Sequence, residues 1–298
     1  MKATSLLNYH FFTIDTERAI LFEKFTYPSY RFLLRILDTD SSIVAIGISV
    51  DSRAIGLALA KIDNYKADLI SLFVHPEHRQ KGLGKALLTF LEFELKSKNC
   101  SQLSVVYLCN QTTLYFEKIM QKLNWLEPQP RMLVYEALIQ DFKDLSWLKL
   151  YTSMPSGYTI FPWIELSQQD REFIQNQKSY FLEYPEILSP FQEEENMEVT
   201  NSLGLRYQDK VIGWMITHRV APDTIRYTKL FVKRELQSLG RGIALLARSI
   251  HLHLEKIQAP KMTCAIEFNN IAMVKFGEKR IAPHVRSIRQ SRYSLKKF

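Results

Sequence analysis

One spacing recurs along this chain and constrains its fold more than any other feature. Two segments, Leu72–Lys96 and Leu230–Lys256, each run from a hydrophobic stretch through a basic loop with two glycines into a helix-forming stretch. Gly82 and Gly240 are separated by 240 − 82 = 158 residues, and Gly84 and Gly242 have the same offset. Solenoid units repeat every ~20–50 residues, so this longer period indicates a duplicated domain.

The surroundings of the two segments also match. Residues 42–63 and 202–220 each alternate between apolar and polar residues like two strands joined by a turn, and a third strand then leads into each glycine loop. After each loop follow an amphipathic helix, a β-rich segment and a helix opened by asparagine. We therefore expect two tandem α/β domains, each a mixed sheet flanked by helices. The turn-like composition of "YTSMPSG" predicts domains of residues 1–145 and 146–298.

Composition excludes several classes of protein. The 298 residues are 46% hydrophobic, enough for two cores. No apolar run reaches the ~18 residues of a membrane span, and the first residues do not resemble a signal peptide, so we expect a soluble, cytoplasmic protein without membrane partners. Three scattered cysteines predict neither disulfides nor a metal site. The net charge of +8 gathers toward the end of the chain, which favours a solvated surface over nucleic-acid binding.

Each glycine loop has the composition of an anion site. The first N–H groups of a helix lack partners within the helix, and glycine lets the backbone approach a phosphate closely. Main-chain N–H groups of residues 79–85 would surround a pyrophosphate, assisted by Lys81 and Lys85, and residues 237–242 would do the same with Arg241. A single G-x-G at a strand–helix junction also fits a tight turn, but two copies in matching contexts favour a ligand.

The same residues carry a resemblance to a known family. "VHPEHRQKGLG" and "VKRELQSLGRG" resemble motif A of the GNAT acyltransferase superfamily, although Arg234 stands where the motif has proline. Asn110 and Asn269 match a later asparagine motif. The resemblance implies tandem GNAT domains with centrally splayed sheets and acetyl-CoA or another acyl-CoA as co-substrate. The expected cofactor-binding residues are Phe73, Val74, Arg79, Gln80, Lys81, Gly82, Leu83, Gly84, Lys85, Asn110, Phe231, Val232, Gln237, Ser238, Leu239, Gly240, Arg241, Gly242 and Asn269.

The resemblance also implies N-acyl transfer to an amine. Main-chain N–H groups near Phe73–Val74 or Phe231–Val232 would hold the thioester oxygen. The strand glutamate that often serves as base in the family is absent from both copies. The tyrosine acid is replaced by Phe116 and Phe276, unless a one-residue shift brings in Tyr115.

Polar residues of the second copy supply other candidates. His218 and Tyr227 lie on adjoining predicted strands and are catalytic candidates, although both also fit ordinary strand positions. The acidic run before the second hairpin would form the acceptor lid and attract a basic amine such as a polyamine, a lysine or ornithine side chain, or a peptide; a solvated loop is the other interpretation. Its candidate residues are Glu183, Glu186, Glu193, Glu194 and Glu195.

The expected function is therefore acyl-CoA-dependent N-acyltransfer, with acceptor chemistry slightly favoured in the second copy. A non-catalytic acyl-CoA sensor or scaffold is the alternative, because both strand carboxylates are missing. The sequence does not define acyl length or oligomeric state.

Overall fold

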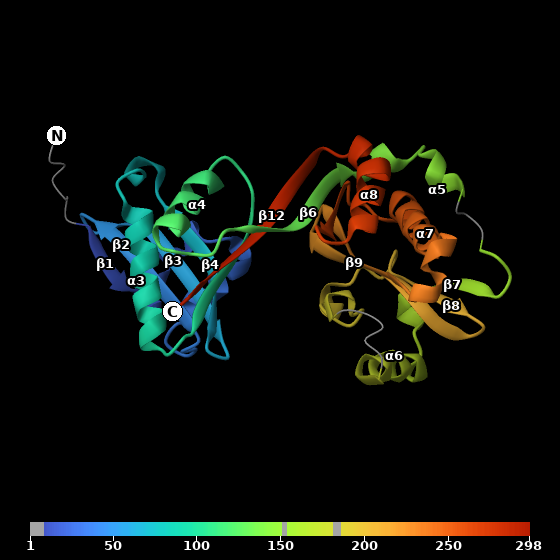
Figure 1. Cartoon of the computed structure of the whole chain (residues 1–298), viewed down its shortest axis with the longest axis horizontal. Helices are drawn as coiled ribbons and strands as arrows, with labels where there is room; N and C mark the ends of the chain where they lie inside the picture. Colours follow the sequence, from blue (N-terminus) through green and yellow to red (C-terminus); the bar gives the residue numbers. More distant parts are fainter. Residues whose placement is uncertain (1–8, 151–153, 181–185) are drawn as a thin grey trace. The chain divides into compact units, whose positions relative to one another are not determined.

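The computed structural model describes residues 9–150, 154–180 and 186–298 (Figure 1). For residues 150, 177–180, 186, 238 and 239 it describes the backbone alone. The chain forms two compact units, residues 1–131 with 290–298 and residues 132–289. These bounds differ from the single boundary expected after residue 145. The difference arises because each unit takes one strand from beyond that boundary.

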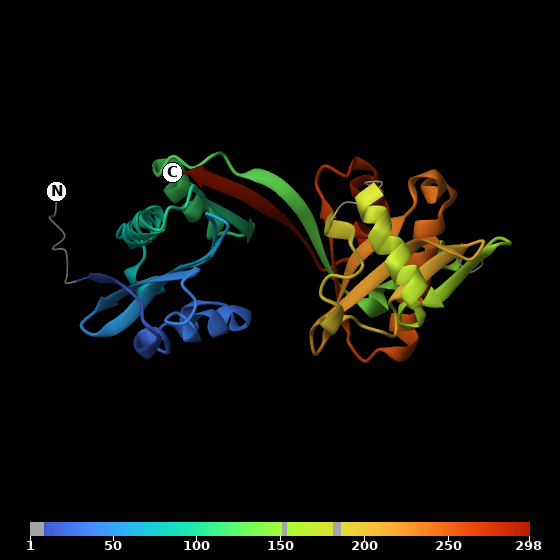
Figure 2. The same cartoon turned by 90° about the horizontal axis from the view of Figure 1, so that it is seen from below.

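Unit 1 contains a mixed sheet in the order β1-β2-β3-β4-β5-β12. Among the strands that the structure describes in this unit, β4 and β5 are the one pair of parallel neighbours. Figure 2 shows α3 and α4 on one face of this sheet and the N-terminal helices on the other. The elements are β1 (His10–Thr13), α1 (Thr16–Ala19), η1 (Glu23–Phe25), η2 (Pro28–Tyr30), α2 (Arg31–Arg35), β2 (Ile43–Val50), β3 (Arg53–Asp63), β4 (Lys66–Val74), η3 (Pro76–His78), α3 (Leu83–Ser97), β5 (Gln102–Leu108), α4 (Thr113–Lys122) and β12 (Ser287–Lys297).

Unit 2 repeats this plan in the order β6-β11-β10-β9-β8-β7. Again a single neighbouring pair, β10 with β11, is parallel among the described strands. Its elements are β6 (Gln129–Leu138), η4 (Ile139–Phe142), α5 (Ser146–Leu150), β7 (Tyr158–Pro162), η5 (Trp163–Glu165), α6 (Gln168–Tyr180), η6 (Glu186–Leu188), η7 (Glu194–Asn196), β8 (Leu203–Tyr207), β9 (Lys210–Ala221), β10 (Thr224–Val232), η8 (Arg234–Leu239), α7 (Arg241–Lys256), β11 (Lys261–Glu267), α8 (Ile271–Arg280) and η9 (Ala282–His284).

Apolar residues on both faces of each central strand explain the layered cores. In β2, Val44 and Ile46 pack in the core under α3, whereas Ile43 and Ala45 pack in the core on the other face. Side chains alternate between the faces of a sheet, so a nearly continuous apolar strand is buried on both sides. Helix α3 closes one face with a stripe of buried leucines, Leu83, Leu87, Leu88, Leu91 and Leu95.

The two units exchange their sixth strands. The later part of β6 pairs with β11 from Leu138↔Lys261 to Met132↔Glu267, so this strand completes unit 2. Strand β12 pairs with β5 from Ser291↔Leu108 to Lys297↔Gln102 and completes unit 1. Residues 290–298 therefore belong to the fold of the N-terminal unit.

The exchanged C-terminal strand is tied into unit 1 by a buried polar cluster. Glu92 is 5% exposed and accepts a hydrogen bond from Trp125 Nε1 at 2.8 Å. Its other oxygen lies 2.5 Å from Lys296 Nζ. A buried carboxylate is stable only when it is paired, so Lys296 is part of the core of unit 1.

Both sheets open at the same place. Strands β4 and β5 pair only from Lys66↔Gln102 to Asp68↔Ser104, although each continues for several residues. Strands β10 and β11 likewise pair only from Thr224↔Lys261 to Tyr227↔Cys264. A bulge follows, at Ile70 in β4 and Thr228 in β10, where the register with the antiparallel neighbour shifts. The expected mixed, centrally splayed sheet is confirmed in both units.

Candidate functional site

Each glycine loop begins a helix beside the opening of its sheet. Gly82 and Gly240 have φ of 81° and 73°, left-handed values that favour glycine, and they precede α3 and α7. The first N–H groups of these helices point toward the loop and have no acceptor within the helix. Lys81 and Lys85 are exposed beside the first loop. A helix start of this kind can bind an anion such as a phosphate.

The second glycine of each loop is packed differently in the two units. A Cβ on Gly84 would lie 3.2 Å from Ile119 Cδ1, so α4 limits the space there. A Cβ on Gly242 would lie 3.7 Å from Val232 Cγ2, which is an ordinary contact. Packing therefore restricts the side chain at position 84 but leaves room at position 242.

Arg79 and Gln237 anchor their loops to the preceding strands. Arg79 Nε donates to the main-chain oxygen of Val74 at 2.9 Å, and Gln237 Nε2 donates to that of Val232 at 2.8 Å. The Arg79 guanidinium also lies 5.5 Å from the centre of the Phe73 ring. These two predicted cofactor residues thus fix the loop against the end of the strand.

The direction of the strand amides differs between the two residues at the end of each splayed strand. His75 N donates to Ile55 O at 2.7 Å, and Lys233 N donates to Ile212 O at 2.8 Å. Successive amides along a strand point to opposite edges. The N–H groups of Val74 and Val232 therefore face the opening between the parallel strands.

Phe73 and Phe231 have their amides directed toward the antiparallel neighbour instead. Their rings belong to the cores, since Phe73 stacks on Phe25 at 5.1 Å and Phe231 packs on Trp214 at 4.5 Å between ring centres. Of the four residues expected to hold the thioester oxygen, the geometry supports Val74 and Val232.

The asparagines after the splayed strands start the next helices. Asn110 Oδ1 accepts from Thr112 N at 2.8 Å and from Thr113 N at 3.2 Å, before α4. In unit 2 the equivalent contact comes from Asn270, whose Oδ1 accepts from Met273 N at 3.2 Å, rather than from the predicted Asn269. Helix capping explains an asparagine at these points.

Helix α4 presents the two aromatic candidates on different sides. Phe116 packs against Tyr107 with ring centres 5.4 Å apart. Tyr115 is 59% exposed. The tyrosine available to solvent in this helix is therefore Tyr115.

His218 is enclosed by the segment that precedes the second hairpin. It is fully buried, with Nε2 3.2 Å from the main-chain oxygen of Gln192 and Nδ1 2.7 Å from Thr228 Oγ1. A carbonyl only accepts, so the ring proton is assigned to Nε2, and Nδ1 accepts from the threonine hydroxyl. Burial lowers the pKa of His218 below its usual value. Both ring nitrogens of His218 are therefore engaged in hydrogen bonds within unit 2.

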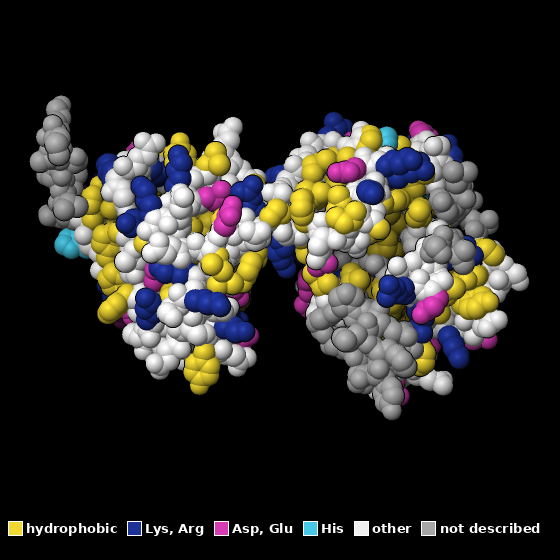
Figure 3. All heavy atoms as spheres, in the orientation of Figure 1, with side chains coloured by type: hydrophobic (Ala, Val, Ile, Leu, Met, Phe, Trp, Pro, Cys, Tyr) yellow, Lys and Arg dark blue, Asp and Glu magenta, His cyan; other side chains and the backbone are white. Residues whose placement is uncertain are grey.

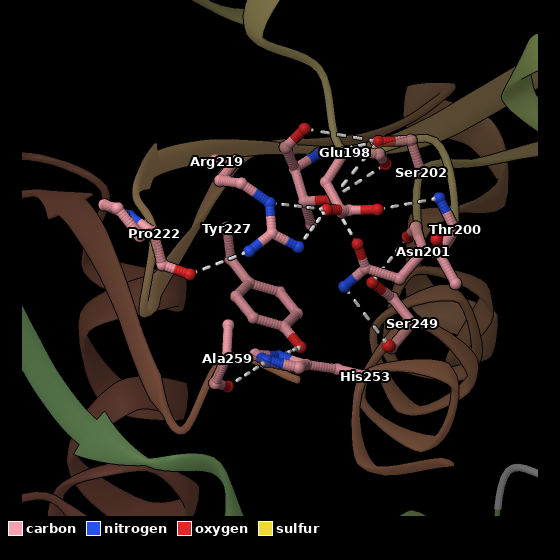
Figure 4. A network of polar contacts seen from close by, with 11 residues as sticks. Glu198, Thr200, Asn201, Ser202, Arg219, Pro222, Tyr227, Ser249, His253 and Ala259 are labelled. Atoms are coloured by element: carbon pink, nitrogen blue, oxygen red, sulfur yellow. Dashed lines mark hydrogen bonds and ion pairs between the residues drawn. The ribbon is translucent and has the colours of Figure 1, made fainter. Parts of the chain in front are cut away.

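Tyr227 points with its hydroxyl toward His253 of α7 (Figure 4). Its hydroxyl donates to His253 Nδ1 at 3.0 Å, and His253 Nε2 donates to Ala259 O at 2.8 Å. Burial raises the pKa of Tyr227 and lowers that of His253. The structure does not bring His218 and Tyr227 together, because Tyr227 sits opposite Thr217 and shares its face of the sheet.

Figure 4 also shows a buried network that sequence reasoning missed. Thr217 Oγ1 donates to Asn201 Oδ1 at 2.5 Å, and Ser249 Oγ donates to Asn201 O at 2.7 Å. Glu198 pairs with Arg219 at 2.6 Å. Burial opposes the charge of Glu198, but hydrogen bonds from Thr200 and Arg219 hold its pKa below the usual value. These contacts fasten the segment around residues 198–202 to β9 and α7.

Two of the five glutamates of the predicted acidic lid pair with arginines in the part of the chain that the structure describes. Glu193 forms an ion pair with Arg226, and Glu194 forms a two-pronged pair with Arg171 at 2.8 and 3.0 Å. Glu195 is exposed and accepts from Asn196 Nδ2 at 3.2 Å. Glu183 lies outside the described residues, as do the side chains of Glu186, Ser238 and Leu239. The pairing reduces the negative field expected from this run.

Unit 2 also has a cavity of about 400 Å³ that is separate from the glycine loop and from the acidic run. It contains none of the predicted site residues. Its lining comes from the later part of α7 and from residues near β7 and β8: Met154, Ile160, Phe161, Pro162, Thr200, Leu203, Arg248, His251, Leu252 and Lys256.

Three further observations concern surface charge, metal ligands and membrane-spanning helices. On the face drawn in Figure 3, the Lys and Arg side chains of each unit are interspersed with hydrophobic and neutral ones. Within residues 9–150, 154–180 and 186–298, no group of three or more His, Cys, Asp and Glu is placed to hold a metal ion. No helix in the part of the chain described is both long and apolar enough to span a membrane.

Comparisons with known proteins agree with this geometry. The family model described as "Acetyltransferase (GNAT) family" matches residues 9–118. A tandem GNAT protein from the clavulanic acid biosynthesis pathway has a TM-score of 0.65 at 12% identity, over 97% of this chain and 98% of its own. A GCN5-related N-acetyltransferase from Sphaerobacter thermophilus gives 0.65 at 16% identity, over 97% and 95%. No curated protein sequence matches the chain.

A splayed mixed sheet with a glycine loop at its opening, present twice, defines the class as a tandem GNAT fold. The family model matches unit 1 through residues 9–118, and the solved structures share the tandem fold of the whole chain.

Proposed function

We propose that this protein transfers an acetyl or longer acyl group from acyl-CoA to a primary amine of a small molecule or peptide. The GNAT family uses acetyl-CoA. The observation that carries the proposal is that the Val74 amide faces the sheet opening beside the loop of Gly82. One strand end and one helix start thus supply donors for a thioester oxygen and for phosphates.

Acyl-CoA would be held by the loops of both units and would supply the thioester. In unit 1, the Val74 N–H would stabilise the oxyanion that forms when the amine attacks the carbonyl. The new C–N bond replaces the C–S bond, the amine gives up a proton, and the thiolate gains one. Tyr115 is the exposed candidate donor for the thiolate.

We place the proposed chemistry in unit 1 rather than in unit 2, because contacts in unit 2 cover the bulge of its strand. In unit 2, residues 187–198 lie over the bulge: the main-chain oxygen of Gln192 accepts from His218 Nε2, and that of Ile187 accepts from Lys229 Nζ. In unit 1, Ser71 follows the bulge and bonds Thr26 Oγ1 at 2.6 Å. Neither strand offers a carboxylate at the bulge positions Ile70–Ser71 or Thr228–Lys229, so we expect the amine to lose its proton to water.

The acceptor remains a primary amine in this proposal. The acidic run supports a basic acceptor less strongly than the sequence suggested. Glu193 is neutralised by Arg226, and Glu194 is neutralised by Arg171. Exposed Glu195 remains available for such attraction.

The test combines binding with turnover. Titration calorimetry with acetyl-CoA on the whole chain should show binding that Gly84→Glu removes from unit 1 and Gly242→Glu from unit 2. Thiol release over a panel of amines should then depend on Gly84. Unchanged binding in both variants and in the double variant would refute the acyl-CoA assignment.

The missing carboxylates also favour a second candidate, a non-catalytic acyl-CoA-binding protein. Saturable acetyl-CoA binding without thiol release for any amine would support that candidate.

A further inference from the structure

Lys229 is a buried amine at the bulge of β10. It follows Thr228 and is only 4% exposed. Its Nζ donates to the main-chain oxygen of Ile187 at 2.5 Å and to Gln192 Oε1 at 2.9 Å. A lysine ammonium is rarely buried, because it must exchange water for other acceptors. These two oxygens therefore belong to a site for a primary ammonium, which Lys229 occupies.

The walls of this site are held independently of Lys229. The main-chain oxygen of Gln192 accepts from His218 Nε2 at 3.2 Å. The main-chain oxygen of Leu188 accepts from Trp214 Nε1 at 3.0 Å. Since Trp214 and His218 both come from β9, the segment carrying the acceptors stays fastened to the sheet when the lysine is shortened.

The equivalent position in unit 1 carries no amine. Ser71 lies 158 residues before Lys229 and also follows the bulge residue, Ile70. Its hydroxyl bonds Thr26 Oγ1 at 2.6 Å, so the contact to the facing segment there joins two hydroxyl groups and involves no ammonium. The buried ammonium is thus a property of the second unit.

We propose that Lys229 is the built-in occupant of a primary-amine subsite in unit 2. The subsite lies on the face of β10 covered by residues 187–198. Its identification as the acceptor side rests on the proposed function, whereas the subsite itself rests on the two hydrogen bonds. Lys229→Ala removes three methylene groups and the ammonium, which are the atoms of propylammonium. The ligand class is therefore a small, unbranched primary amine.

The experiment measures thermal unfolding of the whole chain with propylammonium chloride, against sodium chloride at equal ionic strength. In Lys229→Ala, the transition of unit 2 should rise by roughly 3–6 °C when the amine is at ten times its dissociation constant. The wild type should show no such rise, because its own lysine fills the site.

Two controls separate an ammonium site from a simple cavity. Lys229→Met fills the same space with an apolar chain, so propylammonium should not stabilise it. 1-Propanol, which has the size of the amine but no charge, should not stabilise Lys229→Ala. Equal stabilisation by propanol would overturn the proposal.

A second substitution guards against loss of folding. Lys229→Ser copies the residue found in unit 1 and should respond to propylammonium like the alanine variant. If either variant is unfolded alone, the amine should restore its folded circular dichroism signal. Absence of any amine-dependent effect in both variants would overturn the proposal. No acyl-CoA is present in these experiments, so failure of the acyltransferase assignment would leave their result unchanged.

Discussion

The side-chain amide of Gln237 donates a hydrogen bond to the main-chain oxygen of Val232, at 2.8 Å. Arg79 makes the same contact with Val74 in unit 1. Two different side chains thus perform one task, which is to hold a glycine loop against the end of a splayed strand. The task requires an N–H donor of suitable reach rather than a positive charge.

This equivalence predicts which substitutions unit 1 accepts. Arg79→Gln should keep acetyl-CoA affinity within about threefold, whereas Arg79→Leu should lower it about tenfold or more, since one hydrogen bond from a charged donor contributes about 1.5–3 kcal/mol. Calorimetric titration checks both, with Arg53→Leu on the exposed turn end of β3 as the control. Equal losses in Arg79→Gln and Arg79→Leu would mean that the guanidinium charge contacts the ligand.

The two glycines of the second loop should differ in what they tolerate. Gly240 has φ of 73°, so Gly240→Ala should destabilise unit 2 by about 1–2 kcal/mol. Gly242 is helical and a Cβ there meets only ordinary contacts, so Gly242→Ala should change the free energy of unfolding by less than about 0.5 kcal/mol or stabilise it. Urea unfolding of the two variants measures the difference. Similar losses in both would contradict the role assigned to the left-handed turn.

Two tyrosine substitutions should distinguish a residue that stabilises unit 2 from a residue that takes part in catalysis. Tyr227→Phe leaves His253 Nδ1 without its donor, so it should destabilise unit 2 by about 1–3 kcal/mol and leave thiol release unchanged. Tyr115→Phe should leave stability unchanged and lower kcat about a hundredfold if the thiolate takes its proton from this residue. Exposed Tyr65→Phe is the matched control for the second variant. A fall in kcat with Tyr227→Phe at unchanged stability would return that residue to the catalytic candidates.

The stability of unit 2 should fall in mild acid. The folded-state pKa of His218 is lowered from 6.5, so the unfolded chain takes up this proton first as pH decreases. The stabilisation is complete above about pH 6.5 and is lost below it, at up to about 1.4 kcal/mol per pH unit. His218→Gln should reduce this slope in urea unfolding measured from pH 7 to pH 5. His10→Gln, at an exposed position in unit 1, should leave it unchanged.

Removing residues 290–298 should affect unit 1 selectively. The deletion takes away β12 pairing with β5 and the Lys296 partner of Glu92. We expect the unfolding transition of unit 1 to move to lower urea concentration while that of unit 2 is unchanged. A synthetic peptide of residues 287–298 should restore it. A deletion that leaves both transitions in place would show that unit 1 does not need the strand.

Sequence patterns predicted much of this fold because they act locally. The left-handed glycines, the paired hairpins and the strand–loop–helix order each depend on a few neighbouring residues, and Gly82 and Gly240 occupy the expected turns. The strand pattern of "MLVYEAL" was likewise visible. Its partner was not, because alternation identifies a strand without identifying the sheet that it joins.

The site was harder to predict for a related reason. The glutamates of the acidic run pair with arginines that are distant in sequence: Arg171 is 23 residues from Glu194, and Arg226 is 33 residues from Glu193. The sequence alone therefore gave no sign that these carboxylates are neutralised. His253 is a helix residue whose partners, Tyr227 and Ala259, become neighbours only in the folded unit. Burial and pairing of such groups depend on tertiary packing, which no local pattern contains.

The exchanged strand also determines when, during synthesis of the chain, the sheet of unit 1 can be completed. A ribosome makes residues 1–131 first, yet their sheet lacks its last member until residues 291–297 have been made, after all of unit 2. The N-terminal unit therefore completes its sheet only after translation has passed through the second. Any product that stops early lacks a finished first sheet, so the proposed acyl-transfer activity is reserved for chains that carry both units.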